Sequence, residues 1–448
     1  MPEPRDPSIE LGPDGCPAGG LIVTVPNDGP EFDAQSSDEN IAGRLIEFLS
    51  EVPGFSYQRA LADDLEGASK AYQALRKSKL SYYRFQVPFG RTDELTQQAL
   101  SALSEQPWTD GKVFAIEPDH DITLDALVGG TFTPGGQHNA YRDGFGRAVA
   151  RAAGATGAGR RVVILDTGYA GPIPIAAAWD ITSGQAVPVA APYGDAHGHG
   201  TEMLTLAHSL APDAEYAYVR LATHARRITI WGLLSALMIA KHDCAGDVIS
   251  MSLGFDAMTA CPHCGGTGAQ KAFSLETQVA FVASYAGPSG RLPVLLASTG
   301  NGGHSDRIKY PSRFHEVVTI ASIDSAGNHS RFSNYDRTGQ AQRHHLCAYG
   351  GQTDPGNQPV EHVGLHGTSA RYGTSHATAY SAGMMALLWS HLGIDDRDNF
   401  LDAVKQHHTL RLGQPMTHGH GLICFDPGTH PLAPRYSLTI GGRRISLP

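Results

Sequence analysis

The sequence predicts an α/β fold in which a parallel sheet is covered by helices on both faces, with a small α+β domain in front of it. From residue 161 onward, nearly continuous apolar strands alternate with helical segments, which is typical of a parallel sheet buried on both faces. Before residue 127, fewer strands are interleaved with helices, and one strand alternates apolar with polar side chains, as a half-buried strand does.

These patterns and the changes in composition divide the chain into five regions. They are a disordered tail over 1–20, an N-terminal α+β domain over 21–126, a Gly- and Ala-rich linker over 127–154, the α/β domain over 155–425 and a C-terminal β-hairpin extension over 426–448.

The N-terminal elements are predicted from periodicity. Ser36 and Glu39 have the spacing of a capping box, and apolar residues follow at helical spacing up to residue 49. The other elements are strands over 21–25, 83–89 and 112–116, and a helix over 95–103.

The elements of the α/β domain begin as an alternation of strands and helices. A short helix over 141–153 leads into the first strand, and the Gly441-Gly442 turn predicts a closing hairpin. The strands are expected over 161–166, 214–221, 247–254, 293–301 and 317–322, and the helices over 202–209, 228–240 and 379–392.

Composition limits the classes of function. The net charge of −10, with no compensating basic stretch, argues against a nucleic-acid partner. No apolar run approaches the roughly 20 residues that span a bilayer, so no membrane partner is expected. Because the first twenty residues lack a basic start followed by an apolar stretch, we expect a cytoplasmic protein with reduced thiols. The sequence gives no indication of oligomeric state.

Three distant segments each offer a group that nucleophilic acyl transfer needs. Asp166 ends an apolar strand, His199 lies in the run His-Gly-His-Gly-Thr, and Ser375 precedes a long apolar helix. In such chemistry the hydroxyl attacks, the imidazole takes its proton, and the carboxylate orients the imidazole. A fourth residue, Asn301, stands beside glycines and offers an amide that can donate to an oxyanion.

The segments around these four residues resemble the four signatures of the subtilisin-like serine proteases, the subtilase or S8 peptidase family, in the same order. The resemblance extends over about residues 155–425. It implies a subtilisin-like sheet and a serine endopeptidase that acts on proteins or peptides through an acyl-enzyme, with no cofactor required for catalysis. Because the family's catalytic histidine precedes Gly-Thr, the resemblance selects His199 over His197.

The resemblance also assigns roles to the site. It makes Asp166 the orienting acid, His199 the base, Ser375 the nucleophile and Asn301 an oxyanion donor. The strand that pairs with the substrate backbone would be Ser252, Leu253 and Gly254, and the primary specificity pocket would be lined by Ala297, Ser298, Thr299 and Gly300. Two positions depart from the family's pattern: Glu202 stands where a second histidine is usual, and His376 stands where methionine is common.

Several questions stay open from the sequence. Cys261 and Cys264 have a spacing that suits zinc or a disulfide, but the ligand set is incomplete, and structural calcium or zinc is left undecided. The N-terminal domain is either a propeptide-like inhibitor and folding aid or a permanent regulatory domain. The alternatives to hydrolysis are a peptide ligase or cyclase, a non-catalytic peptide-binding module, and a metal or redox function of the two cysteines.

Overall fold

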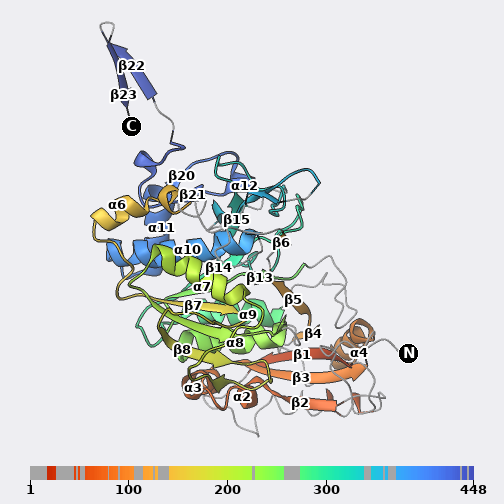
Figure 1. The fold of residues 1–448 in the computed structure, drawn as a ribbon. Helices are drawn as coiled ribbons and strands as arrows, with labels where there is room; N and C mark the ends of the chain where they lie inside the picture. The colour runs from red at the N-terminus through yellow and green to blue at the C-terminus, as the bar shows by residue number, and fades with distance from the viewer. Residues whose placement is uncertain are drawn as a thin grey trace.

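The computed structural model describes most of the chain, including nearly all of the α/β domain (Figure 1). The described residues are 18–26, 45–46, 49–50, 56–78, 80–88, 91–104, 115–124, 127–129, 141–223, 228–256, 273–337, 345–356, 359–361, 370–433, 436–440 and 443–447.

A ten-stranded sheet forms the centre of the α/β domain. All neighbours from β21 to β8 run parallel, and the edge strands β20 and β9 are antiparallel. In spatial order the strands are β20 (Thr409–Leu410), β21 (Leu422–Ile423), β16 (His345–Tyr349), β15 (Val317–Ile323), β14 (Val294–Ser298), β12 (Val248–Met251), β7 (Arg161–Asp166), β10 (Glu215–Arg220), β8 (Ile175–Asp180) and β9 (Val187–Pro188).

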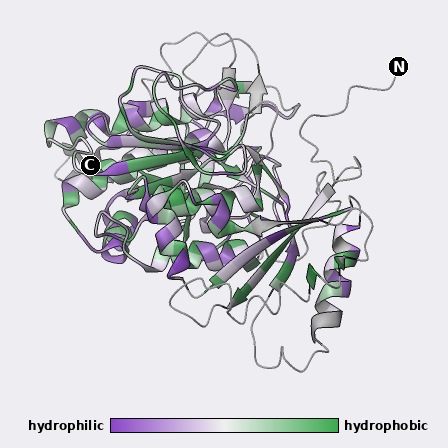
Figure 2. Ribbon diagram, turned by 90° about the horizontal axis from the view of Figure 1, so that it is seen from below, coloured by the Kyte–Doolittle hydropathy of each residue, from purple (hydrophilic) through white to green (hydrophobic). Residues whose placement is uncertain are grey.

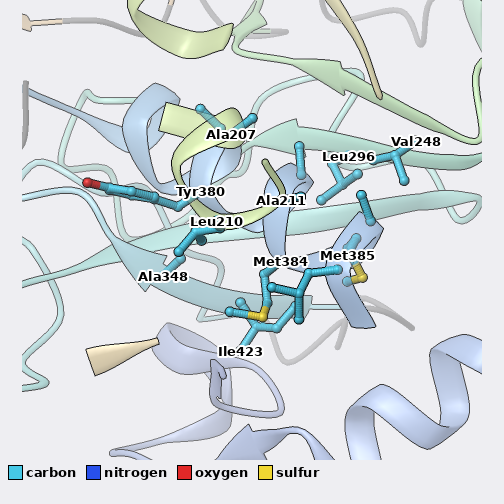
Figure 3. Close-up of a cluster of buried hydrophobic side chains, with 14 of the residues drawn as sticks. Ala207, Leu210, Ala211, Val248, Leu296, Ala348, Tyr380, Met384, Met385 and Ile423 are labelled. Carbon is cyan, nitrogen blue, oxygen red and sulfur yellow. The ribbon is translucent and has the colours of Figure 1, made fainter. Parts of the chain in front are cut away.

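Alternate residues of each central strand enter two different cores. Along β7, Val162 and Ile164 face α7 (His199–Leu210) and α10 (Thr374–Leu392), while Val163 and Leu165 face α8 (Ile230–His242) and α9 (Phe273–Ser284). Figure 3 shows the first core, in which Ala207 and Leu210 of α7 lie against Tyr380 and Met384 of α10 over the sheet. The two covered faces confirm the predicted α/β class.

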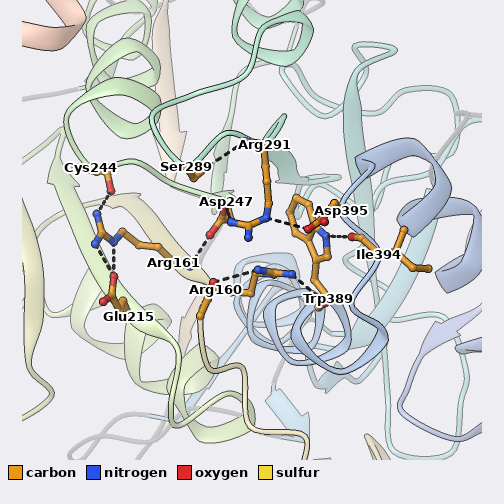
Figure 4. A network of polar contacts seen from close by, with 11 residues as sticks. Arg160, Arg161, Glu215, Cys244, Asp247, Ser289, Arg291, Trp389, Ile394 and Asp395 are labelled. Atoms are coloured by element: carbon orange, nitrogen blue, oxygen red, sulfur yellow. Dashed lines mark hydrogen bonds and ion pairs between the residues drawn. The ribbon is translucent and has the colours of Figure 1, made fainter.

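The beginning of the sheet is held by an ionic network at the end opposite to Asp166 (Figure 4). The backbone N–H of Arg161 donates to Asp247 at 3.0 Å, and the Arg161 guanidinium donates to Glu215 and to the carbonyl of Cys244. Arg291 reaches the other oxygen of Asp247 at 3.4 Å. These contacts tie the amino ends of β7, β10 and β12 together, at the end of the sheet opposite to Asp166.

The N-terminal domain is a four-stranded antiparallel sheet in the order β2-β3-β1-β4. Its strands are β1 (Ala18–Pro26), β2 (Ser56–Ala60), β3 (Leu80–Pro88) and β4 (Ala115–Pro118), and its helices are α2 (Leu61–Asp64), α3 (Ser69–Arg76) and α4 (Thr92–Ser104). One face, with Leu21, Val23 and Phe85, packs with Leu95 of α4. The other face joins the core formed by α8 and α9, through Ile22 and through α2 and α3.

The N-terminal sheet and the α/β domain share one buried core. Ile22 and Tyr82 belong to the same buried cluster as Leu234 of α8 and Leu275 of α9. Figure 2 shows the small sheet lying beside the larger domain, with apolar residues along its strands. One face of the N-terminal sheet is therefore buried by docking on the α/β domain.

Two acids of the N-terminal region cap helices of the α/β domain. The carboxylate of Glu117 accepts hydrogen bonds from the N–H groups of Phe273 (2.5 Å) and Ser274 (3.0 Å), which begin α9. Asp119 accepts from the N–H of Trp231 at the start of α8, at 2.9 Å. These bonds satisfy helix donors that have no partner within the helix. Burial raises the pKa of Glu117 to about 7, although the bonds from Ser274 act in the opposite direction.

One acid of the α/β domain caps in the reverse direction. Asp243, directly after α8, accepts from the N–H groups of Lys70 (3.1 Å) and Ala71 (2.9 Å) in the first turn of α3. The interface is thus apolar at its centre, with carboxylates from each side placed on helix N-termini of the other.

The segment after β4 runs back along the α/β domain as two short strands. β5 (Asp121–Leu124) lies between β11 (Ile228–Thr229) and β13 (Leu253–Gly254), antiparallel to both. β6 (Leu127–Gly129) pairs antiparallel with β19 (Ala370–Tyr372). The beginning of the predicted linker is therefore a strand, because it finds a partner more than two hundred positions away.

Most predicted elements are present with shifted ends. The predicted helix over 228–240 was wrong in its first two residues, which form β11, and the strand expected over 112–116 is described from Ala115 to Pro118. β1 begins at Ala18, inside the region expected to be a disordered tail. The helix predicted over 141–153 includes α6 (Arg147–Ala152). α10 begins at Thr374, ahead of the predicted start.

The remaining elements are peripheral. The predicted C-terminal hairpin is present as β22 and β23, which project from the body in Figure 1. Within the described part of the chain, no helix is long and apolar enough to cross a bilayer. The peripheral elements are β17 (Gln352–Thr353), β18 (Pro359–Glu361), α11 (Arg397–His407), α12 (Pro415–His418), the 3₁₀ helix Pro427–Thr429, β22 (Tyr436–Ile440) and β23 (Arg443–Leu447).

Candidate active site

Asp166 and His199 meet at the carboxyl end of β7. Nδ1 of His199 lies 2.7 and 2.9 Å from the two carboxylate oxygens of Asp166, and both side chains are buried. The N–H of Thr167 also donates to Asp166, at 2.8 Å. A carboxylate in this position holds the proton on Nδ1, which leaves Nε2 as the basic nitrogen of the ring.

The first turn of α7 is seated directly on the turn that follows β7. A Cβ on Gly200 would stand 2.3 Å from the carbonyl oxygen of Gly168, so only glycine allows this approach. The N–H of Gly200 donates to Oγ1 of Thr167 at 2.9 Å. The glycine beside His199 therefore serves the contact between the imidazole and Asp166.

Asp195 caps the same turn. It accepts hydrogen bonds from the N–H of Gly198 (2.8 Å), the N–H of Thr201 (2.8 Å) and Oγ1 of Thr201 (2.7 Å). Burial alone would raise the pKa of Asp195, but these bonds hold it below its usual value. The cap fixes the position of His199, the first residue of the helix.

Ser375 lies in the first turn of α10 and is buried against the end of β12. Its hydroxyl donates to the carbonyl of Ser252 at 3.2 Å, and the hydroxyl of Ser252 donates to the carbonyl of Ser375 at 3.1 Å. The N-terminus of a helix favours negative charge, because its N–H groups have no intrahelical acceptors.

Asn301 is linked to the residue before Ser375. Its Oδ1 accepts from both the N–H and the hydroxyl of Thr374, each at 2.9 Å. These two bonds orient the amide with its oxygen on Thr374 and its nitrogen directed away. Asn334 fixes the loop that follows Asn301, because its Oδ1 accepts from the N–H groups of Gly302 and His304 at 3.0 Å each.

Close packing between α7 and α10 brings their first turns together. A Cβ on Gly383 of α10 would stand 2.2 Å from the carbonyl oxygen of Ala207 in α7. Nε2 of His376 lies 3.4 Å from Oε1 of Glu202, and both side chains are buried. Since Glu202 is one turn after His199 and His376 follows Ser375, these contacts place the histidine and the serine at one end of the sheet.

The predicted substrate strand is paired in this structure with the chain's own N-terminal region. Leu253 lies opposite Leu124, and Gly254 lies opposite Thr123, in antiparallel register. The predicted pocket residues Ala297 and Ser298 end β14, and Thr299 and Gly300 follow directly. Cys261 and Cys264, the candidate metal ligands, lie outside the described residues. Over the described ranges, no group of three or more His, Cys, Asp or Glu side chains is arranged to hold a metal.

Comparison with known families decides which class of protein carries this arrangement. The family model described as "Subtilase family" matches residues 177–411, about half of the chain, and this range contains His199, Asn301 and Ser375. The chain belongs to the subtilase family. It is a subtilisin-like serine peptidase, as the sequence predicted, and its substrates are proteins or peptides. Asp166 precedes the matched range, so its contact with His199 is an independent observation.

Curated subtilases with protease names are similar over most of their own length. "Thermostable alkaline protease" of Halalkalibacterium halodurans is 26% identical over 343 residues, covering 74% of this chain and 80% of that protein. "Thermitase" of Thermoactinomyces vulgaris is 26% identical over 53% of this chain and 77% of its own length. "Subtilisin DY" of Bacillus licheniformis is 24% identical, with 61% and 92% coverage.

Sequence analysis missed three supporting residues of this subtilase site. Asp195 carried no local signal, since it lies three residues before Gly198, which occupies the N-cap position of α7. Asn334 lies in the Ser-Asn-Tyr turn, but nothing in the sequence shows which loop its amide holds. Gly383 looked like an ordinary small residue in an apolar helix, and only the packing on Ala207 shows its role.

Proposed function

We propose that this subtilase is a serine endopeptidase in which Ser375 is the nucleophile, His199 the general base and Asp166 the group that orients His199. The contact between Asp166 and His199 at 2.7 Å carries the proposal, because it fixes the tautomer that a base needs. The packing of α7 on α10, next to that contact, supports the assignment of Ser375.

The reaction begins when Oγ of Ser375 attacks the carbonyl carbon of the scissile bond and its proton passes to Nε2 of His199. The resulting imidazolium then gives the proton to the departing amine, which leaves an ester between Ser375 and the acyl part of the substrate. A water molecule, deprotonated by His199, cleaves the ester and restores the serine. The carbonyl of Ser252 now accepts from the Ser375 hydroxyl, and a substrate N–H donating there would release that hydroxyl for attack.

The oxyanion formed on attack would be stabilised by Asn301 and by the start of α10. Because Oδ1 of Asn301 is held by Thr374, the amide group has its nitrogen as the donor for a ligand. The N–H groups in the first turn of α10 add their partial positive charge.

We also propose that the N-terminal domain acts as a propeptide that occupies the substrate cleft. β5 lies between β11 and β13 as the middle strand of three, which is how an extended substrate would add to these edges. The shared apolar core and the three capping carboxylates support stable docking. For localisation, the cytoplasm remains a proposal from sequence alone.

Peptide hydrolysis tests the catalytic proposal. His199→Ala should lower kcat by about a million-fold because it removes the base, and Asp166→Asn by about 10,000-fold because it removes the correct tautomer. A matched control is His208→Ala, on the same helix but away from Asp166, which should retain activity. A loss of less than about tenfold in His199→Ala would contradict the assignment. Adding an amine nucleophile and analysing the products distinguishes hydrolysis from peptide ligation.

Mass spectrometry of the purified full chain tests the propeptide proposal. Wild-type protein should show a break between residues 118 and 150, and Ser375→Ala should stay intact. A wild-type chain that hydrolyses peptides and yet remains unbroken would favour a permanent regulatory domain.

A further inference from the structure

Four aromatic rings lie in a row at the beginning of β5. His120, directly before β5, stacks on Phe255 with ring centroids 6.1 Å apart and an interplanar angle of 23°. Phe255 stacks in turn on Tyr310 at 5.5 Å, and Tyr310 lies against Phe314 at 4.9 Å. All four side chains are buried. Because His120 belongs to the N-terminal region and the other three rings to the α/β domain, the row crosses the interface between the two.

The three rings of the α/β domain, Phe255, Tyr310 and Phe314, form an aromatic platform that the domain itself holds in place. The N–H of Phe255 donates to the carbonyl of Tyr310 at 2.9 Å, and the N–H of Tyr310 donates to the carbonyl of Phe255 at 3.0 Å. The N–H of Phe314 donates to the carbonyl of Pro311 at 3.0 Å. Since Phe255 directly follows β13, the platform is anchored at the end of the predicted substrate strand, whichever chain occupies the cleft.

The backbone of His120 is also held by the α/β domain. Its carbonyl accepts from the N–H of Ile230 at 3.0 Å, which continues the pairing of β5 with β11. The N–H of the preceding residue, Asp119, donates instead to the carbonyl of Gly20 in β1, at 2.8 Å. Backbone bonds of this kind do not depend on the side chain, so an extended substrate in place of β5 would be held as far as the position of His120.

The register of β5 gives the place of this residue along a substrate. Thr123 lies opposite Gly254, so His120 is three residues before the residue that pairs with Gly254. β13 leads away from Ser252, whose carbonyl accepts from the Ser375 hydroxyl. Because the strand in the cleft is antiparallel to β13, its earlier residues lie farther from Ser375. The position of His120 therefore precedes the scissile bond, at the far end of the acyl side.

The surroundings of this position favour a ring over a charge. Ile122 lies two residues after His120, on the same face of an extended chain, and is buried in one cluster with the aromatic platform. The carboxylate next to the platform, Asp256, lies 2.9 Å from Nε of Arg307. The position is thus lined by apolar and aromatic surface, and the neighbouring negative charge already has a cationic partner.

We propose that the aromatic platform is a subsite that makes this subtilase selective for substrates with an aromatic side chain three residues before the one that pairs with Gly254. The inference rests on the proposed peptidase function and deepens it. The substrate ring would stack on Phe255 as His120 does. Stacking of two rings adds to the burial of apolar area, so phenylalanine is preferred over leucine although both are apolar. The same contact lets His120 hold the N-terminal region in the cleft.

Hydrolysis of matched peptides tests the proposal. The peptides copy residues 119–129 with His, Phe, Leu, Lys or Ala in place of residue 120, and mass spectrometry identifies the bond that is cleaved. Wild-type enzyme should cleave the Phe peptide with a kcat/KM about fivefold above that of the Leu peptide, the typical gain from one aromatic pair. It should cleave the His peptide faster than the Ala peptide, and the Lys peptide no faster than the Ala peptide. Phe255→Leu should bring the ratio of Phe to Leu close to one and leave cleavage of the Ala peptide nearly unchanged.

The controls separate this inference from the function on which it rests. Phe281→Leu removes a ring on α9 that lies 5.2 Å from Tyr285, and should keep the preference for Phe over Leu. Equal cleavage of the Phe and Leu peptides by wild-type enzyme, a preference that survives Phe255→Leu, or a preference for Lys would overturn the subsite and leave the peptidase proposal intact. Hydrolysis of casein with none of the peptides cleaved would overturn it too, because the peptides then do not bind as β5 does. Failure to cleave casein and every peptide would contradict the peptidase function, and the inference with it.

Hydrogen exchange in the full chain gives a second test that needs no turnover. In Ser375→Ala protein, adding His120→Ala should raise exchange at residues 121–124 by about fivefold, whereas His120→Phe should keep their protection. In protein that also carries Phe255→Leu, His120→Ala should have little further effect, because the partner ring is already gone. Fully additive effects of the two substitutions would show that the rings do not interact, and would overturn the subsite.

Discussion

Oε1 of Glu202 lies 3.4 Å from Nε2 of His376, and this buried pair joins the helix that carries the histidine of the site to the helix that carries the serine. Both residues depart from the family's usual pattern at positions one turn after His199 and directly after Ser375. Burying a carboxylate costs free energy unless a donor or a cation lies beside it. His376 is such a partner for Glu202, so the two departures from the family's pattern belong together.

Exchanging the pair for the family's usual residues tests this dependence. Glu202→His and His376→Met should each destabilise the protein and lower kcat, because each leaves the other residue of the pair buried without its partner. The double variant Glu202→His with His376→Met should recover most of both losses, with a coupling free energy of about 1–3 kcal/mol in urea unfolding. Strict additivity of the single variants would show that the two side chains do not interact.

Gly383 lets α10 pack closely on α7, against the backbone of Ala207. Gly383→Ala should force the helices apart, because backbone atoms cannot yield as a flexible side chain can. We expect a loss of about 1–3 kcal/mol in unfolding free energy, together with reduced kcat, since the movement separates His199 from Ser375. Gly232→Ala within α8, where an added Cβ meets its nearest atoms only at 3.8 and 3.9 Å, is the control for the loss of a helical glycine. An unchanged kcat in Gly383→Ala would argue against the role of this contact.

Asn301→Ala should lower kcat by about 100- to 1,000-fold with little change in KM, as expected for a donor that acts mainly on the transition state. Steady-state hydrolysis of a peptide gives both constants. Asn334→Ala affects the same loop without offering the proposed donor, and should change KM as well. A higher KM with an unchanged kcat in Asn301→Ala would contradict the oxyanion role.

Glu117 predicts that docking of the N-terminal domain weakens as pH rises. Burial raises its pKa from an ordinary 4.5 to about 7, so the docked state is favoured below pH 4.5 and loses this advantage as pH rises through 7. Hydrogen exchange in full-length Ser375→Ala should show protection of residues 115–124 falling by up to about 100-fold between pH 5 and pH 8. Adding Glu117→Gln should flatten this dependence. Protection that rises with pH would have the wrong sign for the proposed cause.

The sequence was sufficient for the elements whose signal is local. β7 is an apolar run that ends in a turn, and α10 begins within a Gly-Thr-Ser segment, so the strand end that carries Asp166 and the helix that carries Ser375 were predictable. The parallel arrangement of the strands followed from their alternation with helices.

The parts that sequence missed depend on partners far along the chain. β5 and β6 are three or four residues long and become strands only by pairing with β11, β13 and β19. Glu117 looked like an ordinary strand residue, because the helix that it caps begins more than 150 positions later. The second face of the N-terminal sheet likewise has no local sign that α8 and α9 will cover it.

The central claim is that Ser375 is the nucleophile, and mapping the residue labelled by a fluorophosphonate probe tests it most directly. In wild-type protein that hydrolyses peptides, mass spectrometry of the digested adduct should place the label on Ser375, and Ser375→Ala should not react. A label found on another residue, or one retained in Ser375→Ala, would contradict the account.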